Sequence, residues 1–388
     1  MNLLTAIAER ADDLAAEART ADELRRLPDE TWKLLLDSGV LRALQPARFG
    51  GGEVPLVDFL DAVLELSRVS PSAGWVAGVI GVHPWQLALF ADEAQQEMWV
   101  ADPTRMHSSS YNPTGKAVRV DGGYEVSGRW SFSSGCDHCV AVNVGAIVKP
   151  GDGADDAVPD YRSFLLHGDQ YGIEDNWHVA GLRGTGSKDI VVAGAFVPDH
   201  RSQSHLDYAL GRSLPGQDVN PGVLYRMPWS VVFNAALAAS VVGSARGFVE
   251  LWTTEAATRV VPPGVKLADD PLTQRRLADA TWAVDAATSG LRATAADLWA
   301  AAESGHMPSM DERAVHRWRM NRGCELVGQA VGDLMRAASG RSVFLDHPLQ
   351  SRYQDVQGGL GHAFLVPDPL AKAVGGSLLG ATTPEMVL

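Results

Sequence analysis

The stretch Gly128-Arg129-Trp130-Ser131-Phe132-Ser133-Ser134-Gly135 alternates aromatic rings with small hydroxyl side chains and closes on a glycine. The two rings offer flat apolar cover, and the serines offer hydroxyls and backbone amides at the end of a strand. This combination suits a flat ligand with polar edges. Taken alone, the same residues equally describe an ordinary strand that runs into a serine-rich turn.

A second segment, Gly181-Leu182-Arg183-Gly184-Thr185-Gly186-Ser187, follows further along the chain. It lacks the Lys-Ser/Thr pair of a phosphate-binding loop, and it precedes the β-rich run Ile190–Phe196 instead of a helix. We therefore interpret it as a tight turn with the positive charge of Arg183 beside it.

Both segments lie in a region whose sequence is typical of β-strands, and we predict a β-domain over residues 104–212. Short β-rich runs alternate there with Gly, Ser and Asp clusters, and Asp121-Gly122-Gly123 is typical of a hairpin turn. The flanking regions 1–103 and 213–388 show helical periodicity instead. The expected fold class is α+β, with an N-terminal helical domain, a central β-barrel or sandwich and a C-terminal four-helix bundle.

The helical regions divide into several expected helices. In the first hundred residues we expect helices over 3–19, 29–39, 55–69, 73–90 and 92–99. After residue 213 we expect them over 229–258, 272–304, 311–339 and 369–379. The long members of this second set favour a bundle that could also form the core of a tetramer.

Composition narrows the classes of function and location. The formal net charge of −14 argues against nucleic acid and anionic membranes as partners, since both require basic patches. Three cysteines cannot form a disulfide framework in a chain of 388 residues. No signal-peptide pattern and no long uninterrupted apolar run is visible, so we expect a cytoplasmic protein.

Several motifs, in this order, resemble the acyl-CoA dehydrogenase superfamily and, within it, the two-component flavin-dependent monooxygenases (group D). The similar branch comprises the 3-hydroxy-9,10-secoandrostatriene-dione hydroxylases and related polyketide-pathway hydroxylases. The motifs are Gly74-Trp75, Gly81–Phe90, Asn112-Pro113, Trp130–His138, Gly181–Ser187, Val197–Arg201 and Asp269-Asp270-Pro271. The similarity covers nearly the whole chain.

This resemblance implies an oxygenase that uses FMNH2 or FADH2 and O2 to hydroxylate an aromatic or phenolic substrate through a C4a-hydroperoxyflavin. A separate NAD(P)H:flavin reductase would supply the reduced flavin, and the oxygenase would be a homotetramer.

The resemblance also implies roles for individual residues. Ser133 or Ser134 would meet flavin N5, and His362 would steady the peroxide or accept a phenolic proton; His83 would orient the substrate. The implied catalytic residues are His362, His83 and Ser134. The cofactor-binding residues are Ser110, Tyr111, Phe132, Ser133, Ser134, Trp177 and Arg259, and the substrate-binding residues are His83, Trp85 and Trp229. No metal site is expected.

At two places in the sequence, the role of the residues cannot be taken directly from the family. The family's usual arginine before Asp355 is Gln354 here, with Arg352 two residues earlier, which puts the contact of that arginine in doubt. Cys136-Asp137-His138-Cys139 has the spacing of a metal or redox motif. Only one further thiol, Cys324, exists, and the thioredoxin-like context is absent, so we interpret it as structural.

Three other functions stay open. An acyl-CoA dehydrogenase with tightly bound FAD would need a carboxylate base, and no glutamate lies between Val356 and Pro384. A nitrososynthase-like enzyme that oxidises nitrogen on a nucleotide-linked amino sugar would favour clustered Arg or Lys in its pocket, whereas Trp85, Phe90 and Trp229 would favour an aromatic substrate. A non-catalytic scaffold is the third.

Overall fold

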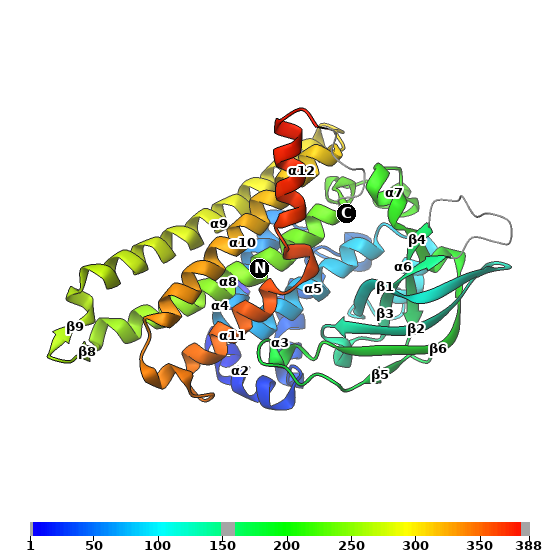
Figure 1. Ribbon diagram of the computed structural model, residues 1–388. Coiled ribbons are helices and arrows are strands. Elements are labelled where there is room, and N and C mark those ends of the chain that lie inside the picture. Colours follow the sequence, from blue (N-terminus) through cyan, green and yellow to red (C-terminus); the bar gives the residue numbers. More distant parts are fainter. Residues whose placement is uncertain (1–2, 149–159, 382–388) are drawn as a thin grey trace.

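The computed structural model describes residues 3–148 and 160–381. An elongated helical bundle lies on one side of a curled sheet, and the N-terminal helices fill the space between them (Figure 1). The N-terminal helices are α1 (Leu3–Ala8), α2 (Ala11–Leu24), α3 (Asp29–Ser38), α4 (Leu56–Val69), α5 (Pro71–Leu87) and α6 (Asp92–Trp99).

Local sequence signals explain where several helices begin and end. The α3 helix ends at Gly39, whose φ of 80° is one that glycine adopts without strain. The α5 helix begins at Pro71, where a missing N–H costs nothing. The single helix expected over 3–19 is divided into α1 and α2, because the backbone leaves helical geometry at Glu9 and Arg10.

One seven-stranded sheet forms the central region, in the order β5-β6-β2-β1-β3-β4-β7. Among the described strand pairs of this sheet, only β1–β3 is parallel. The sheet curls, so that β4 also contacts β6 around a shared apolar core. The strands are β1 (His107–Val120), β2 (Gly123–Ser133), β3 (Ala141–Val148), β4 (Asp160–His167), β5 (Gly172–Glu174), β6 (Lys188–Pro198) and β7 (Ser202–Ser204).

The predicted hairpin at residues 121–123 is present. Val120 pairs with Gly123 across the turn, and Gly122 has a φ of 74°. Only glycine and a few polar residues adopt this conformation readily, which is why the turn signal was visible in the sequence.

The C-terminal region is a helical bundle built around one long helix, α8. Asp270 caps α9 through the N–H of Thr273, and a Ser309–Glu312 capping box starts α10. The elements are α7 (His205–Leu210), α8 (Trp229–Thr258), the hairpin β8 (Val260–Val261) and β9 (Val265–Lys266), α9 (Pro271–Glu303), α10 (Met310–Arg336), α11 (Pro348–Leu360) and α12 (Asp368–Leu378).

The α8 helix is the central helix of the molecule and packs against α4, α5, α9, α10 and α11. By length and composition alone it could cross a bilayer, but 94% of its most apolar window is buried inside the protein. Its apolar character is therefore that of a core helix. The α11 helix, which the sequence analysis did not anticipate, packs on α8 and leads directly to His362.

Candidate active site

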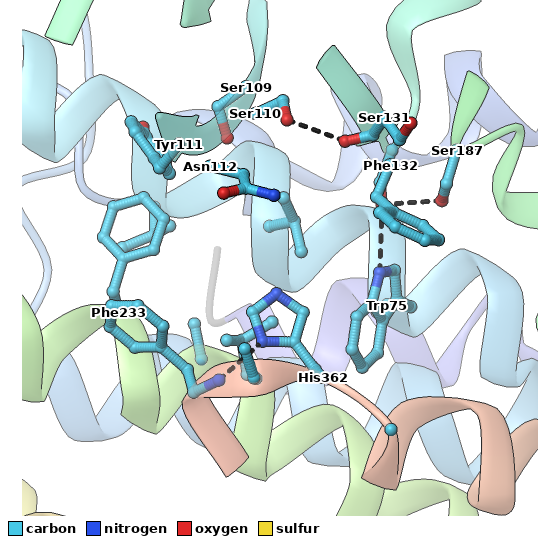
Figure 2. A pocket seen from close by; sticks show the side chains of 18 of the residues that line it. Trp75, Ser109, Ser110, Tyr111, Asn112, Ser131, Phe132, Ser187, Phe233 and His362 are labelled. Carbon is cyan, nitrogen blue, oxygen red and sulfur yellow. Dashed lines mark hydrogen bonds between the residues drawn. The ribbon is translucent and has the colours of Figure 1, made fainter. Parts of the chain in front are cut away.

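A cavity of about 710 Å³ lies between the sheet and the helices α5 and α8. Segments that are far apart in the sequence contribute to its wall, which combines serine hydroxyls with aromatic rings (Figure 2). Helices α5 and α8 contribute Trp75, Trp229 and Phe233 to the wall. Strand β1 contributes Ser110, Tyr111 and Asn112, and the segment around the end of β2 contributes Ser131, Phe132 and Ser134. The loop before β6 contributes Trp177, Leu182 and Ser187, and the turn after α11 contributes His362 and Phe364.

A chain of hydrogen bonds joins the segments 128–135 and 181–187 along one edge of the cavity, which we call the serine edge. The Trp75 indole Nε1–H donates to Ser134 Oγ at 3.1 Å, and Ser134 Oγ lies 2.7 Å from Ser187 Oγ. Ser187 Oγ lies 2.7 Å from Thr185 Oγ1, whose hydroxyl donates to the Leu182 carbonyl. These bonds fix the hydroxyls of Ser134 and Ser187 on the cavity wall.

Phe132 stands at the mouth of the cavity in a strained backbone conformation. Its φ is 70°, and its side chain remains 70% exposed. The ring meets Trp177 edge-on, with the ring centroids 6.1 Å apart. A non-glycine residue in the left-handed region is held there by its surroundings, and such residues are often found at ligand sites.

The second glycine-rich segment is held against α11. The Leu182 N–H donates to Asp355 Oδ1 at 2.6 Å, and a Cβ on Gly181 would come within 1.9 Å of the Gln354 carbonyl oxygen. Burial raises the pKa of the Asp355 carboxyl to about 7. This close approach explains the glycine at position 181. Ser187, at the end of the same segment, lies at the cavity because the next residue, Lys188, pairs with Ser133 at the end of β2.

His362 points into the cavity from the turn after α11, facing Asn112 (Figure 2). Its Nδ1 accepts a hydrogen bond of 3.1 Å from the Phe364 N–H. Burial lowers the pKa of His362 to about 4, so the ring is neutral near pH 7. With Nδ1 as the acceptor, the proton resides on Nε2, and His362 offers a hydrogen-bond donor to the cavity.

Aromatic rings form the opposite wall. The ring centroids of Trp229 and Phe233 lie 4.7 Å apart, and those of Tyr111 and Phe233 lie 5.3 Å apart in an edge-to-face arrangement. The Tyr111 hydroxyl donates to Gln86 Oε1 behind the wall. Such a wall suits a flat apolar molecule.

No Asp, Glu, Lys or Arg is among the described residues that line the cavity. The cavity therefore offers, within the part of the chain that the structure describes, no carboxylate base and no cationic group for a phosphate.

The structure brings His362, Ser134, Ser110, Tyr111, Phe132, Trp177 and Trp229 together on the wall. Four other predicted site residues do not lie there. His83 is fully buried behind the wall and donates from Nδ1 to the His107 carbonyl at 2.8 Å. Trp85 donates from Nε1 to the Leu224 carbonyl at 2.8 Å. The Ser133 hydroxyl donates to Ser108 Oγ at 2.9 Å, on the other side of the strand.

Arg259 is the fourth. It caps the far end of α8, about 40 Å along the helix from Phe233, beside Trp252 and Glu255. Within one chain it cannot reach the cavity. Arg352 is also occupied elsewhere: its guanidinium donates to the carbonyls of Arg68 and Val69 at 2.8 Å each, at the end of α4.

Several wall residues were not predicted, namely Trp75, Asn112, Ser187, Phe233 and Phe364. Trp75, Asn112 and Ser187 stand in motifs that carry the family resemblance, but no role in the site was assigned to them. The other two lie in an apolar helix and in the turn after His362, where nothing local distinguishes a cavity residue from a core residue.

Cys136 and Cys139 are both free cysteines, and Cys136 is buried whereas Cys139 is half-buried. Burial raises the pKa of the Cys136 thiol to about 12, which makes it unreactive as a nucleophile. Among residues 3–148 and 160–381, no group of three or more His, Cys, Asp or Glu side chains converges in a metal-binding arrangement.

Comparison with known proteins gives consistent matches over the whole chain. Residues 4–106 match the acyl-CoA dehydrogenase N-terminal domain, and residues 235–367 match the acyl-CoA dehydrogenase C-terminal domain. The oxygenase subunit HsaA of a flavin-dependent monooxygenase from Mycobacterium tuberculosis is 36% identical, with 95% of this chain and 92% of the relative covered.

Two further matches extend this result. The oxygenase component of an FADH2-dependent resorcinol hydroxylase from Rhizobium is 32% identical, with 98% of this chain and 94% of the relative covered. The crystal structure of 3-HSA hydroxylase from Rhodococcus superimposes with a TM-score of 0.93 at 34% identity, covering 100% of this chain and 99% of the other.

Proposed function

We propose that this chain, which belongs to the acyl-CoA dehydrogenase family as an oxygenase component of the flavin-dependent monooxygenases, uses reduced flavin and O2 to hydroxylate a small aromatic or phenolic molecule. The observation that carries the proposal is the cavity wall. It places a serine edge, an aromatic wall and the neutral imidazole of His362 around one space, with no ionisable carboxylate among its described residues.

The wall fits a flavin ring. Ser134 and Ser187 present fixed hydroxyls along one edge, and the rings of Trp75, Phe132 and Trp177 offer flat cover beside them. Ser110 is also on the wall, and its hydroxyl donates to the Ser131 carbonyl at 2.7 Å. When bound there, reduced flavin would supply the two electrons with which O2 is split between the product and water. These residues would hold and orient it and keep bulk water away.

His362 would act as a hydrogen-bond donor toward an oxygen atom in the cavity. The Phe364 N–H occupies Nδ1, so Nε2–H faces the cavity, and the lowered pKa keeps the ring neutral across the physiological range. A neutral imidazole can donate a hydrogen bond to a partly charged oxygen atom without any change in its own protonation state. Of the two roles expected from the sequence, this geometry favours steadying an oxygen over accepting a phenolic proton.

The substrate would lie between His362 and the aromatic wall of Tyr111, Trp229 and Phe233. The wall offers ring-on-ring contact. Asn112, whose carboxamide faces the cavity, could bind one polar substituent (Figure 2). His83 and Trp85 would support this wall from behind without touching the substrate.

The residues of the wall also favour this function over the two alternative enzyme activities. An acyl-CoA dehydrogenase needs a carboxylate to remove a substrate proton, and an enzyme that acts on a nucleotide-linked sugar needs cationic groups. Neither is present among the described wall residues. The named relatives support aromatic hydroxylation as well, since HsaA and the resorcinol hydroxylase are flavin-dependent oxygenase components.

The partners follow from the same proposal. As the oxygenase component of a two-component system, the protein works with a separate flavin reductase and a small aromatic substrate. We further propose that the reductase uses NAD(P)H and binds only transiently, that the oxygenase is a cytoplasmic homotetramer, and that Arg259 reaches a flavin phosphate in a neighbouring subunit. Either FMNH2 or FADH2 would serve as the cofactor.

The test combines binding and product analysis. Reduced FMN and reduced FAD are titrated into the protein without oxygen, and the loaded protein is then mixed with isotopically labelled O2 and a panel of phenols, indoles and polycyclic quinols. We expect a hydroxylated product that carries one labelled oxygen atom. A protein that holds oxidised FAD tightly and reduces a dye with an acyl-CoA thioester would overturn the proposal.

A further inference from the structure

A layer of polar side chains is buried between α5 and the sheet, behind the cavity. In the sheet register, His107 on β1 pairs with Ala141 on β3, which pairs with His167 on β4, so both histidines share one face. Asn143 lies on that same face, two residues from Ala141. His83 of α5 covers this face, and its ring stacks on His107 with the centroids 5.0 Å apart.

Many nitrogen and oxygen atoms in this layer have no protein partner. They are His83 Nε2, both ring nitrogens of His107, both amide atoms of Asn143 and His167 Nε2. His83 and Asn143 are fully buried, and His107 is 1% exposed. Native proteins satisfy nearly all buried polar atoms, and they use ordered water where no protein group is in reach. Six such atoms in one layer indicate water.

The layer connects the cavity with the surface. At its inner end, His83 contacts Tyr111 and Phe233, whose rings line the cavity, at centroid distances of 6.3 and 5.7 Å. At its outer end, His167 Nε2 lies 4.0 Å from Glu97 Oε2, a distance that one water molecule can bridge. The two ends of the sheet segment, His107 and His167, are two strand spacings apart, or about 10 Å.

Several charged groups gather at the outer end of this layer. Glu97 forms ion pairs with His200 at 3.0 Å and with Arg201 at 2.5 Å, and Arg105 and Asp169 also act on His167. The inner end is faced by the uncharged side chains of Tyr111, whose ring contacts His83, and of Gln86, its hydrogen-bond partner. This arrangement would gather protons at the surface and leave the cavity side uncharged.

We propose that the buried polar layer of His83, His107, Asn143 and His167 holds a file of water molecules that conducts protons between the surface at Glu97 and the cavity wall at Tyr111. Burial lowers the pKa of His83 to about 4 and holds the pKa of His107 well below its usual value, so these imidazoles line and orient the file without holding the proton. The use of the protons rests on the proposed function. Insertion of one oxygen atom of O2 into a substrate C–H bond takes two electrons and two protons and releases one water molecule. Reduced flavin bound as its N1-deprotonated anion supplies both electrons and one proton, so the second proton is drawn from solvent through the file.

The first test is structural and needs no flavin. A crystal structure of the protein at a resolution that resolves water should show ordered molecules within hydrogen-bond distance of His83 Nε2, the His107 ring and the Asn143 amide. A dry interface would overturn the proposal whatever the enzyme catalyses.

The second test measures proton movement. Asn143→Leu keeps the side-chain volume similar but removes the polar atoms, and Leu165→Met, at the paired position on β4, is the matched control for local repacking. Protein loaded with reduced flavin is mixed with O2 in a weakly buffered solution that contains a pH indicator. We expect Asn143→Leu to slow proton uptake about tenfold while the reduced-flavin Kd stays unchanged, and Leu165→Met to behave as wild type.

His167→Phe, at the other end of the layer, gives a second variant in case Asn143→Leu does not fold. Unchanged proton uptake in a folded variant whose waters are displaced would overturn the proposal. Wild-type protein that binds reduced flavin and shows no reaction with O2 would instead contradict the proposed function, and the crystallographic test would still decide whether the water file exists.

Discussion

The Nδ1 atom of His362 accepts a hydrogen bond of 3.1 Å from the backbone N–H of Phe364, and this single bond sets the chemistry of the cavity. A neutral imidazole whose Nδ1 is an acceptor carries its proton on Nε2. The turn after α11 thereby presents a donor to the space between the serine edge and the aromatic wall. The same N–H would otherwise need another partner at the start of the short helix.

Ser187→Ala should weaken binding of reduced flavin. In the wild-type protein, Ser187 Oγ lies 2.7 Å from both Ser134 Oγ and Thr185 Oγ1. The substitution removes this hydroxyl from the wall and takes one hydrogen-bond partner from each of these two atoms. We expect the Kd to rise about tenfold, which corresponds to about 1.4 kcal/mol, in an anaerobic fluorescence titration. Ser133→Ala is the matched control, because the Ser133 hydroxyl bonds to Ser108 away from the wall. A larger effect from Ser133→Ala would show that our placement of the flavin edge is wrong.

Two substitutions at Phe132 can separate the effect of backbone strain on stability from the effect of the ring on flavin binding. Phe132→Ala removes the ring and keeps a side chain at a φ of 70°, whereas Phe132→Gly removes both the ring and the strain. Both variants should lose reduced-flavin affinity to the same extent. Chemical denaturation should show Phe132→Gly to be more stable than Phe132→Ala by about 1 kcal/mol. Equal stabilities would mean that the loop is not strained.

Asp355→Asn should stabilise the protein at alkaline pH. Burial raises the pKa of Asp355 to about 7, so its ionisation in the folded state is unfavourable, and wild-type stability falls as pH rises from the unfolded value near 4 to about 7. Asparagine keeps an oxygen for the Leu182 N–H and cannot ionise. We expect a gain of roughly 3 kcal/mol at about pH 8 and little difference at about pH 4. The gain should disappear if the carboxylate is well solvated.

Buried neutral histidines should make the protein sensitive to acid. Burial lowers the pKa of His83 to about 4 and that of His205 to about 3, both below the ordinary value of 6.5. The unfolded chain therefore binds more protons, and stability falls as pH decreases from about 6.5 toward 4. Each group contributes about 3 kcal/mol to this fall, which urea unfolding across this range would detect. His205→Gln, which keeps a polar partner for Ser163, should flatten the decline, and an unchanged slope would exclude His205 as a source.

The sequence predicted much of the fold because its local signals agree with the global structure. The helix expected over 229–258 has those bounds in α8, and the Asp121-Gly122-Gly123 turn joins β1 to β2 as expected. The α11 helix was not predicted because it is short and has two glycines, Gly358 and Gly359, in its last turn, which lower helix propensity.

The site was harder to predict, and the reasons are physical. The serine motif was visible because its residues are adjacent in sequence. The α5 helix is buried all round, so no periodic pattern could tell that Trp75 faces the cavity while His83 and Trp85 face away from it. Ser187 reaches the wall because the next residue, Lys188, pairs with Ser133 at the end of β2, a contact between segments far apart in the chain.

The most direct test of the central claim is the coupling of O2 consumption to hydroxylated product in His362→Ala and His362→Gln. In wild type, most of the O2 consumed should appear in product. His362→Ala removes the donor and should lower this ratio about tenfold, with excess O2 released as hydrogen peroxide, while His362→Gln, which keeps an N–H donor, should recover part of the coupling. An unchanged ratio in His362→Ala, with reduced flavin and substrate bound normally, would contradict the assigned role of His362.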